Sequence, residues 1–107
     1  MSGTLINTYA LGSLVTVKVS FLNEPAGVLA YVYEHYGTGK HVGISLITQN
    51  GCDLGGFSLD EQNRFLEYYG DTGQVYHFRS VTWLDVDWKK GVFKFAFDNP
   101  EKYRKQL

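Results

Sequence analysis

Strict alternation of hydrophobic and polar residues begins at Leu14 and is the first regular pattern along the chain. As far as Phe21, valine or phenylalanine occupies every second position, with a polar residue between each pair. Successive side chains of a strand point to opposite faces, so this period of two predicts a half-buried β-strand over residues 14–21. The turn formers at residues 23–27 predict that the chain then reverses.

The next apolar run, residues 28–36, has no polar face. Its alternating side chains are Val28, Ala30 and Val32 on one face and Leu29, Tyr31 and Tyr33 on the other. A strand with two apolar faces is typical of a central position in a sheet, where both sides are covered. We therefore predict that something beyond the core of the sheet packs against one face of this strand.

A third strand is predicted over residues 42–49. Val42, Ile44 and Leu46 occupy every second position of this run. The run stops at Asn50-Gly51, a pair of residues that tolerates the positive φ angles of a tight turn.

A helix is predicted from Leu59 to Tyr69. Ser58 is followed three positions later by Glu61, which is the spacing of a capping box, where each side chain satisfies a backbone N–H of the first turn. The apolar positions of the segment fall on one side of such a helix, so this side needs a surface to cover. Gly70 is expected to end the helix, because glycine adopts the left-handed conformation at little cost.

Two further strands are predicted in the last third of the chain. Residues 75–83 alternate, and the apolar positions change parity at Leu84, which is what a β-bulge produces. A short hairpin loop at residues 89–91 is followed by three alternating phenylalanines in residues 93–97. We favour a fifth strand there, while residues 91–98 could also form a helical turn packed by these phenylalanines.

Five short strands and one inserted helix indicate a mainly β protein, either a strongly bent antiparallel sheet or a partly open barrel. Asn99 followed by Pro100 is typical of a helix start, so a short C-terminal helix is predicted as far as Lys105. A chain of 107 residues is large enough for one hydrophobic core. Residues 12–107 are therefore expected to form a single domain, preceded by a flexible arm of residues 1–11.

Within residues 12–34, the sequences GSLVTV and, after a gap, PAGVLAYV resemble the opening hairpin of SH3-like barrels of the KOW type. In that family a Gly-Asp-x-Val-x-Val strand is followed by a loop and a Gly-x-x-Gly-x-Val strand. Here Ser13 replaces the usual Asp and Ala30 the usual second Gly, and the helix from Leu59 lies outside the pattern. The resemblance implies a five-stranded antiparallel SH3-like barrel, here with a helix after the third strand. By analogy it also implies RNA or protein binding.

Composition supports a compact domain, since 44% of the residues are hydrophobic and 16% are aromatic. The sequence shows no charged-then-apolar leader and no apolar run near the ~20 residues that span a bilayer. A single cysteine allows no internal disulfide. We therefore expect a cytoplasmic protein that does not associate with membranes.

Charge is distributed unevenly although the net charge is only −1. Residues 1–88 carry four basic and nine acidic residues, whereas residues 89–107 carry six basic and two acidic residues. The body of the protein therefore lacks the clustered cations of a dominant phosphate-binding face. The basic residues near the C-terminus have a simpler explanation. They keep a terminal helix solvated, and their positive charge interacts favourably with the C-terminal end of the helix dipole.

No arrangement of residues predicts catalysis, a metal or a cofactor. Cys52 has no base near it in the sequence and no catalytic signature around it. Asp85 and Asp87 would share one face of a strand, an arrangement that can hold a hard cation but that also protects ordinary edge strands from unwanted pairing. His35 and His41 flank a glycine loop, and two imidazoles without a third ligand make a poor metal site. We expect a non-enzymatic protein.

Aromatic residues are the most suggestive candidates for a binding site, because flat rings provide contact area and stacking at little entropic cost. The predicted contact residues are Tyr31, Tyr33, Tyr36 and Trp88. The expected partner is a protein or peptide, or a second copy of the chain. The alternative is single-stranded nucleic acid or RNA, bound by the same aromatics together with Lys89, Lys90, Lys94, Lys102, Arg104 and Lys105.

Overall fold

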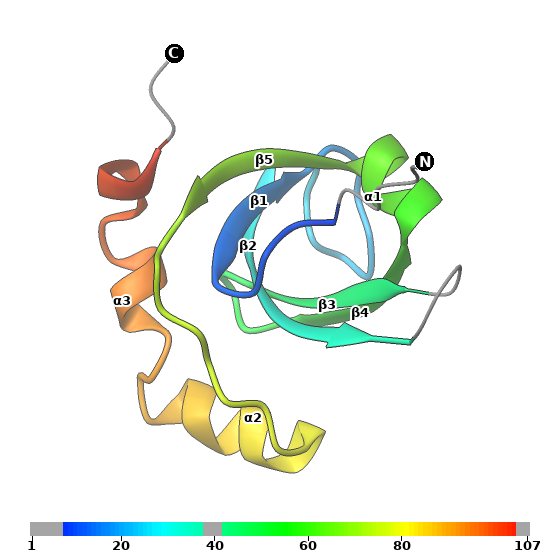
Figure 1. Cartoon of the computed structure of the whole chain (residues 1–107). Helices are drawn as coiled ribbons and strands as arrows, with labels where there is room; N and C mark the ends of the chain where they lie inside the picture. Colours follow the sequence, from blue (N-terminus) through cyan, green and yellow to red (C-terminus); the bar gives the residue numbers. More distant parts are fainter. Residues whose placement is uncertain (1–7, 38–41, 105–107) are drawn as a thin grey trace.

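A five-stranded antiparallel sheet forms the centre of the computed structural model, which describes residues 8–37 and 42–104 (Figure 1). The strands are arranged in the order β4-β3-β2-β1-β5. Their bounds are β1 (Ser13–Val17), β2 (Val28–Tyr36), β3 (Gly43–Thr48), β4 (Asp53–Ser58) and β5 (Leu66–Asp71). The helices are α1 (Leu59–Phe65), α2 (Val81–Lys89), α3 (Lys94–Phe97) and the 3-10 helix η2 (Pro100–Tyr103). In the described part of the chain, none of these helices has the length and apolar character needed to cross a membrane.

Register shifts in three strand pairings bend the sheet around its own core. They fall at Leu14/Val15 between β1 and β5, at Val32/Glu34 between β2 and β3, and at Ile44/Leu46 between β3 and β4. An extra residue in one strand of a pair bends that strand and increases its twist. Helix α1 joins the two edge strands, β4 and β5, and the sheet is not closed (Figure 1).

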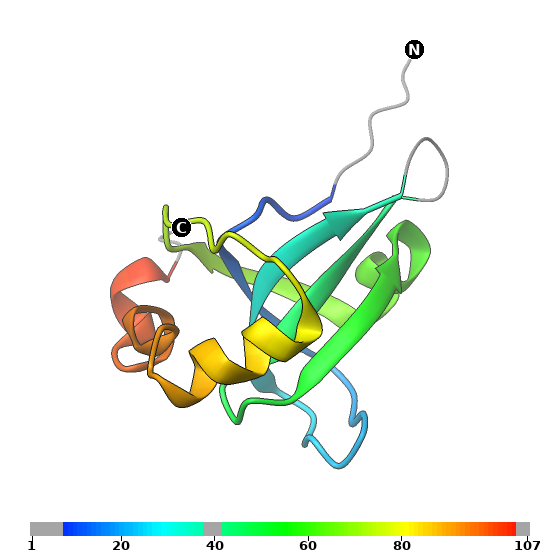
Figure 2. The same cartoon turned by 90° about the horizontal axis from the view of Figure 1, so that it is seen from below.

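Two separate hydrophobic clusters lie on the two faces of the sheet. The inner cluster consists of Val15, Val17, Val28, Ala30, Val32, Ile44, Leu46, Leu54, Phe57 and Leu66. The outer cluster consists of Leu14, Leu29, Tyr31, Tyr33, Ile47, Leu84, Phe93 and Ala96. The last three residues come from the C-terminal segment, which runs along the outside of the sheet (Figures 1 and 2). The prediction that the strand at 28–36 is central and covered on both faces is confirmed.

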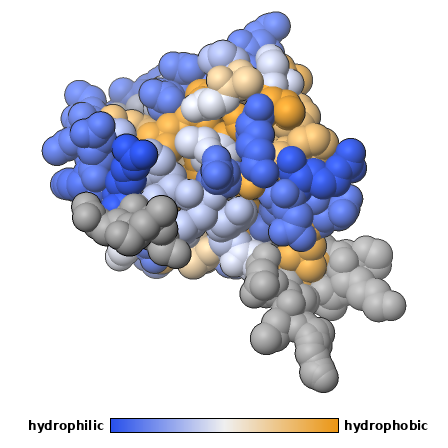
Figure 3. Space-filling view, turned by 90° about the horizontal axis from the view of Figure 1, so that it is seen from above, coloured by the Kyte–Doolittle hydropathy of each residue, from blue (hydrophilic) through white to orange (hydrophobic). Residues whose placement is uncertain are grey.

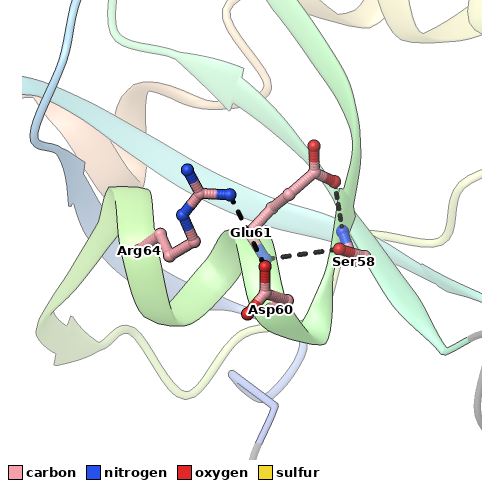
Figure 4. Close-up of polar contacts among 4 residues, drawn as sticks. All are labelled: Ser58, Asp60, Glu61 and Arg64. Atoms are coloured by element: carbon pink, nitrogen blue, oxygen red, sulfur yellow. Dashed lines mark hydrogen bonds and ion pairs between the residues drawn. The ribbon is translucent and has the colours of Figure 1, made fainter.

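The predicted start of the helix at Leu59 is confirmed, and Figure 4 shows its capping box. The Glu61 N–H donates to Ser58 Oγ at 3.2 Å, and the Ser58 N–H donates to Glu61 Oε1 at 2.9 Å. The bond from the Ser58 N–H favours the charged carboxylate and so holds the pKa of Glu61 below its ordinary value. An exposed pair between Arg64 and Asp60, with 3.6 Å between nitrogen and oxygen, lies on the first turns of the same helix.

The predicted end of this helix at Tyr69 is wrong, because the chain leaves the helix after Phe65 and forms β5. Leu66 pairs with Val17 of β1 and is almost fully buried in the inner cluster, so tertiary packing overrides the helical pattern. Gly70 does not end a helix either. It lies within β5, where an added Cβ would be 1.8 Å from the carbonyl oxygen of Tyr103.

Three other predicted elements differ from the structure. Residues 53–58, where no strand was predicted, form the edge strand β4, so the inserted helix follows the fourth strand and not the third. Residues 75–83 form no strand. An irregular stretch to Ser80 leads into α2, whose first turn Ser80 caps by accepting from the Trp83 N–H at 3.2 Å. Residues 93–97 also form no strand, and the helical-turn alternative is correct there.

The ends of the chain agree with the predictions only in part. Pro100 opens a helix, as predicted, but η2 is a single 3-10 turn that ends at Tyr103. Lys105, like residues 1–7 of the predicted arm, lies outside the described residues. At the described end of that arm, Tyr9 stacks on Tyr68 of β5 with ring centroids 6.1 Å apart.

Candidate functional site

Tyr31 and Tyr33 are buried, at 0% and 3% exposure, so neither can contact a partner on the folded protein. Both residues were predicted to lie on a binding surface, and this part of the prediction is wrong. The physical reason is the C-terminal segment, which covers the outer face of β2 with the rings of Phe78, Phe93 and Phe95. The cover foreseen for this strand is thus supplied by the chain itself.

Hydrogen bonds hold both buried tyrosines in place. The Tyr31 hydroxyl donates to the Gln74 carbonyl oxygen at 2.5 Å, and the Tyr33 hydroxyl donates to Asp53 Oδ1 at 2.8 Å. Burial raises the pKa of Tyr31 to about 12. Burial also raises the pKa of Tyr33, and the Asp53 carboxylate that accepts its proton raises it further. These residues stabilise the fold.

Tyr36 and Trp88 are partly exposed, but they lie against different parts of the sheet. Tyr36 packs over Gly43 of β3, where an added Cβ would be 2.4 Å from its hydroxyl oxygen. Trp88, near the end of α2, packs over Gly51 in the β3–β4 turn, where an added Cβ would be 2.6 Å from Nε1. The four predicted contact residues therefore do not form one surface.

A cavity of about 330 Å³ brings Trp88 together with three predicted basic residues. We call it the lysine cavity, and it is lined by Gln49, Trp88, Lys89, Lys90, Gly91, Phe93, Lys94, Phe97 and Asp98. Trp88 contacts Phe93 and Phe97, with ring centroids 5.9 Å apart in each pair. Lys89 forms an ion pair with Asp85, with 3.0 Å between nitrogen and oxygen.

The other predicted cations do not line the lysine cavity. Lys102 Nζ lies 5.0 Å from the centroid of the Tyr103 ring, and Arg104 forms an isolated bridge with Gly70 beside β5. Lys105 lies outside the described residues. The basic C-terminal set is thus divided between the cavity and η2.

A second cavity, of about 450 Å³, lies between the irregular stretch 74–80, α2 and the residues before α3. We call it the apolar groove, and it is lined by Gln74, Val75, Tyr76, His77, Arg79, Asp87, Val92 and Phe95. Val75 is 50% exposed and Val92 is 41% exposed. The groove was not predicted from the sequence, because residues 75–83 were predicted to form a strand.

A polar network forms one side of the apolar groove. Asp87, which is largely buried, accepts a hydrogen bond from the Tyr76 hydroxyl at 2.5 Å and pairs with Arg79, with 3.7 Å between nitrogen and oxygen. The Arg79 guanidinium also lies 4.2 Å from the centroid of the exposed Trp83 ring. Burial, with the neighbouring Asp87 carboxylate, raises the pKa of Tyr76 to about 12.

Hydrophobic residues also gather on the face over β5, between η2 on one side and α1 on the other, with hydrophilic residues bordering them (Figure 3). Exposed Tyr68 of β5 stacks on Tyr9 at this level of the sheet. Tyr9 and Tyr68 line neither the lysine cavity nor the apolar groove.

The remaining candidates are not arranged for catalysis or metal binding. Burial raises the pKa of Cys52, and Glu24 and Asp53 raise it further, which disfavours the reactive thiolate. Because α2 is a helix, Asp85 and Asp87 point away from each other, and the predicted shared face is wrong. His35 Nε2 lies 2.6 Å from the Tyr9 carbonyl oxygen, and His41 lies outside the described residues. Among the described residues, no three His, Cys, Asp or Glu side chains converge as metal ligands would.

Comparisons of the chain with protein-family models, with curated proteins and with solved structures find no match.

Proposed function

We propose that the protein is a non-enzymatic interaction module and that the apolar groove binds a peptide segment of another protein. The observation that carries this proposal is the exposure of Val75 and Val92 on the lining of a cavity of about 450 Å³. Exposed apolar side chains that line a concave site gain from being covered by an apolar side chain of a ligand.

Charge on the rim of the groove favours a peptide with an acidic residue beside its apolar anchor. Asp87 is largely buried, and its carboxylate is already engaged by Tyr76 and Arg79. The Arg79 side chain is 56% exposed, and a guanidinium has five N–H donors, so it can bind a second carboxylate. The groove therefore presents a cation and apolar walls to solvent.

We also propose that the bent sheet is an SH3-like barrel. Support comes from the resemblance of residues 12–34 to the KOW-type hairpin, from β1 lying between β2 and β5, and from the register shifts that curve the sheet. The cytoplasm remains the proposed location, because an unpaired Cys52 suits a reducing compartment.

A library of displayed random peptides tests the binding proposal. We expect selected peptides to carry an apolar residue next to Asp or Glu, and to lose at least tenfold in affinity for Val92→Asp. Val19→Asp is the matched control, because Val19 is also partly exposed, at 37%, but does not line the groove. Circular dichroism would confirm that both variants fold.

Two results would overturn the proposal. One is selection that enriches no peptide, or peptides that bind Val92→Asp and the unmodified protein equally. The other is a dimer, seen by analytical ultracentrifugation, that Val92→Asp abolishes and Val19→Asp does not. That second result would make another copy of the chain the occupant of the groove.

A further inference from the structure

The lysine cavity lies where the end of α2, α3 and the residues after β3 meet, and it shares no lining residue with the apolar groove. We infer that it binds a nucleobase together with its phosphate, presented by single-stranded nucleic acid or by a free nucleotide. Trp88 and Phe97 supply the aromatic wall, and Lys90 and Lys94 supply the cations. This inference concerns a different site from the peptide groove and does not depend on it.

The aromatic wall is held rigidly before any ligand arrives. The Trp88 indole lies against Gly51, whose positive φ of 83° and missing Cβ allow this close approach. Phe93, which is 1% exposed, and Phe97 contact the same indole. A ring already fixed in place loses little conformational entropy when a base stacks on it. Every base can stack in this way because each has a π face.

The charges around the cavity favour one phosphate. Lys89 is already paired with Asp85, and the Asp98 carboxylate offsets part of the remaining positive charge. Lys90 and Lys94 have no ion pair with any described residue. Since residues 1–88 are acidic overall, these two ammonium groups make the cavity locally more attractive to an anion than that part of the protein.

The size of the cavity suits a single nucleotide. A volume of about 330 Å³ lies at the low end of the range for small-molecule sites, roughly 300–1,000 Å³. Gln49 lines the same cavity, and its Oε1 accepts from the Leu29 N–H at 2.9 Å, which fixes the amide group. Its amide NH₂ has no partner among the described residues and can donate to a base or a phosphate.

Tryptophan fluorescence can test this inference directly. Trp83→Phe leaves Trp88 as the only tryptophan, so a ligand that stacks in the cavity changes the emission. The probes are uridine, uridine monophosphate and a short oligouridylate, each titrated at low salt. We expect quenching by the two phosphorylated probes and much weaker binding of uridine. Quenching by the oligouridylate alone would assign the site to a nucleic-acid strand, and equal affinity for both phosphorylated probes would assign it to a free nucleotide.

Lys94→Gln and Lys18→Gln remove the same charge at two places, and Lys18 is an exposed residue that does not line the cavity. If the two lysines together neutralise one phosphate, the logarithm of the oligouridylate affinity should fall with the logarithm of salt concentration with a slope of about −0.7. Lys94→Gln should make this slope shallower, and Lys18→Gln should leave it unchanged. Absence of quenching by both phosphorylated probes, or equal losses in the two lysine variants, would overturn the inference.

Discussion

Tyr31 of β2 donates a hydrogen bond from its hydroxyl to the carbonyl oxygen of Gln74, at 2.5 Å, and so ties the sheet to the first residues of the C-terminal segment. The same hydroxyl accepts from the Tyr76 N–H at 3.1 Å. Residues 74–80 form no strand, so they lack the ladder of backbone bonds that holds the other segments together. One buried side chain thus supplies two of the bonds that keep the cover over the outer face of β2.

Tyr31→Phe should therefore lower the free energy of unfolding by about 1–3 kcal/mol. The variant keeps the ring that packs on Phe93 and Phe95 and removes only the hydroxyl, which leaves the Tyr76 N–H without its partner. Urea denaturation followed by circular dichroism measures the change. Tyr36→Phe is the control, because the Tyr36 hydroxyl makes no hydrogen bond within the described part of the chain, and its cost should stay below about 0.5 kcal/mol. Equal losses in the two variants would contradict the role given to the Tyr31 hydroxyl.

The parts of the fold that the sequence predicted correctly are those set by local chemistry. The side chains of Ser58 and Glu61 each accept a hydrogen bond from the other residue's backbone N–H within one turn, and β2 has apolar residues on both faces from Val28 to Tyr33. Residues 75–83 were wrongly predicted to form a strand because β-branched and aromatic side chains favour strands. The helix start at Ser80 was not recognised, because no acidic residue follows three positions later to complete a capping box. Contacts with the outer cluster, distant in sequence, decide the structure there.

The candidate sites were predictable to the same limited extent. Trp88 and the three lysines of the cavity are close in sequence, so their meeting follows from the turn between α2 and α3. Gln49 joins them from the turn between β3 and β4, which is distant in sequence, and no local pattern indicates that. Tyr31 and Tyr33 were wrongly predicted to be exposed. Two apolar faces indicate that another element must pack on the strand, but they do not show which residues form that element.

Stability should fall as the pH rises above about 10, because folding raises the pKa values of Tyr31 and Tyr76 from 10.0 to about 12. The folded protein holds these protons more tightly than the unfolded chain. The resulting stabilisation is complete below the unfolded pKa and is lost as the pH rises through the folded one. Each tyrosine should contribute a slope of up to about 1.4 kcal/mol per pH unit in this window.

Comparison with Tyr31→Phe isolates one of these groups, since every other side chain is the same in both proteins. The stability difference between the two should be constant from about pH 8 to about pH 10 and should shrink above that. Urea denaturation across this range gives the difference at each pH. A difference that stays constant to about pH 11 would show that Tyr31 ionises as easily in the folded protein as in the unfolded chain.

The two serine caps should contribute similarly, at about 1 kcal/mol each. Ser58→Ala removes the acceptor for the Glu61 N–H, and Ser80→Ala removes the acceptor for the Trp83 N–H. The helices are on different parts of the fold, so the losses should add in the double variant. Thr82→Ala is the control, because Thr82 is exposed in the first turn of α2 and alanine favours helix. Thermal unfolding measures all four variants, and a loss in Thr82→Ala equal to that in Ser80→Ala would contradict the capping role.

Gly51→Ala should disturb both the stability of the fold and the wall of the lysine cavity. Gly51 has a φ of 83°, and an added Cβ would lie 2.6 Å from Trp88 Nε1, so alanine adds backbone strain and displaces the indole. Gly27→Ala separates the two effects, because Gly27 has a φ of 90° but nothing within 4 Å of the added Cβ. We expect about 1 kcal/mol of destabilisation for Gly27→Ala and at least about twice that for Gly51→Ala. In the Trp83→Phe background, only Gly51→Ala should shift the emission of Trp88. An unchanged Trp88 spectrum would mean that Gly51 does not position the ring.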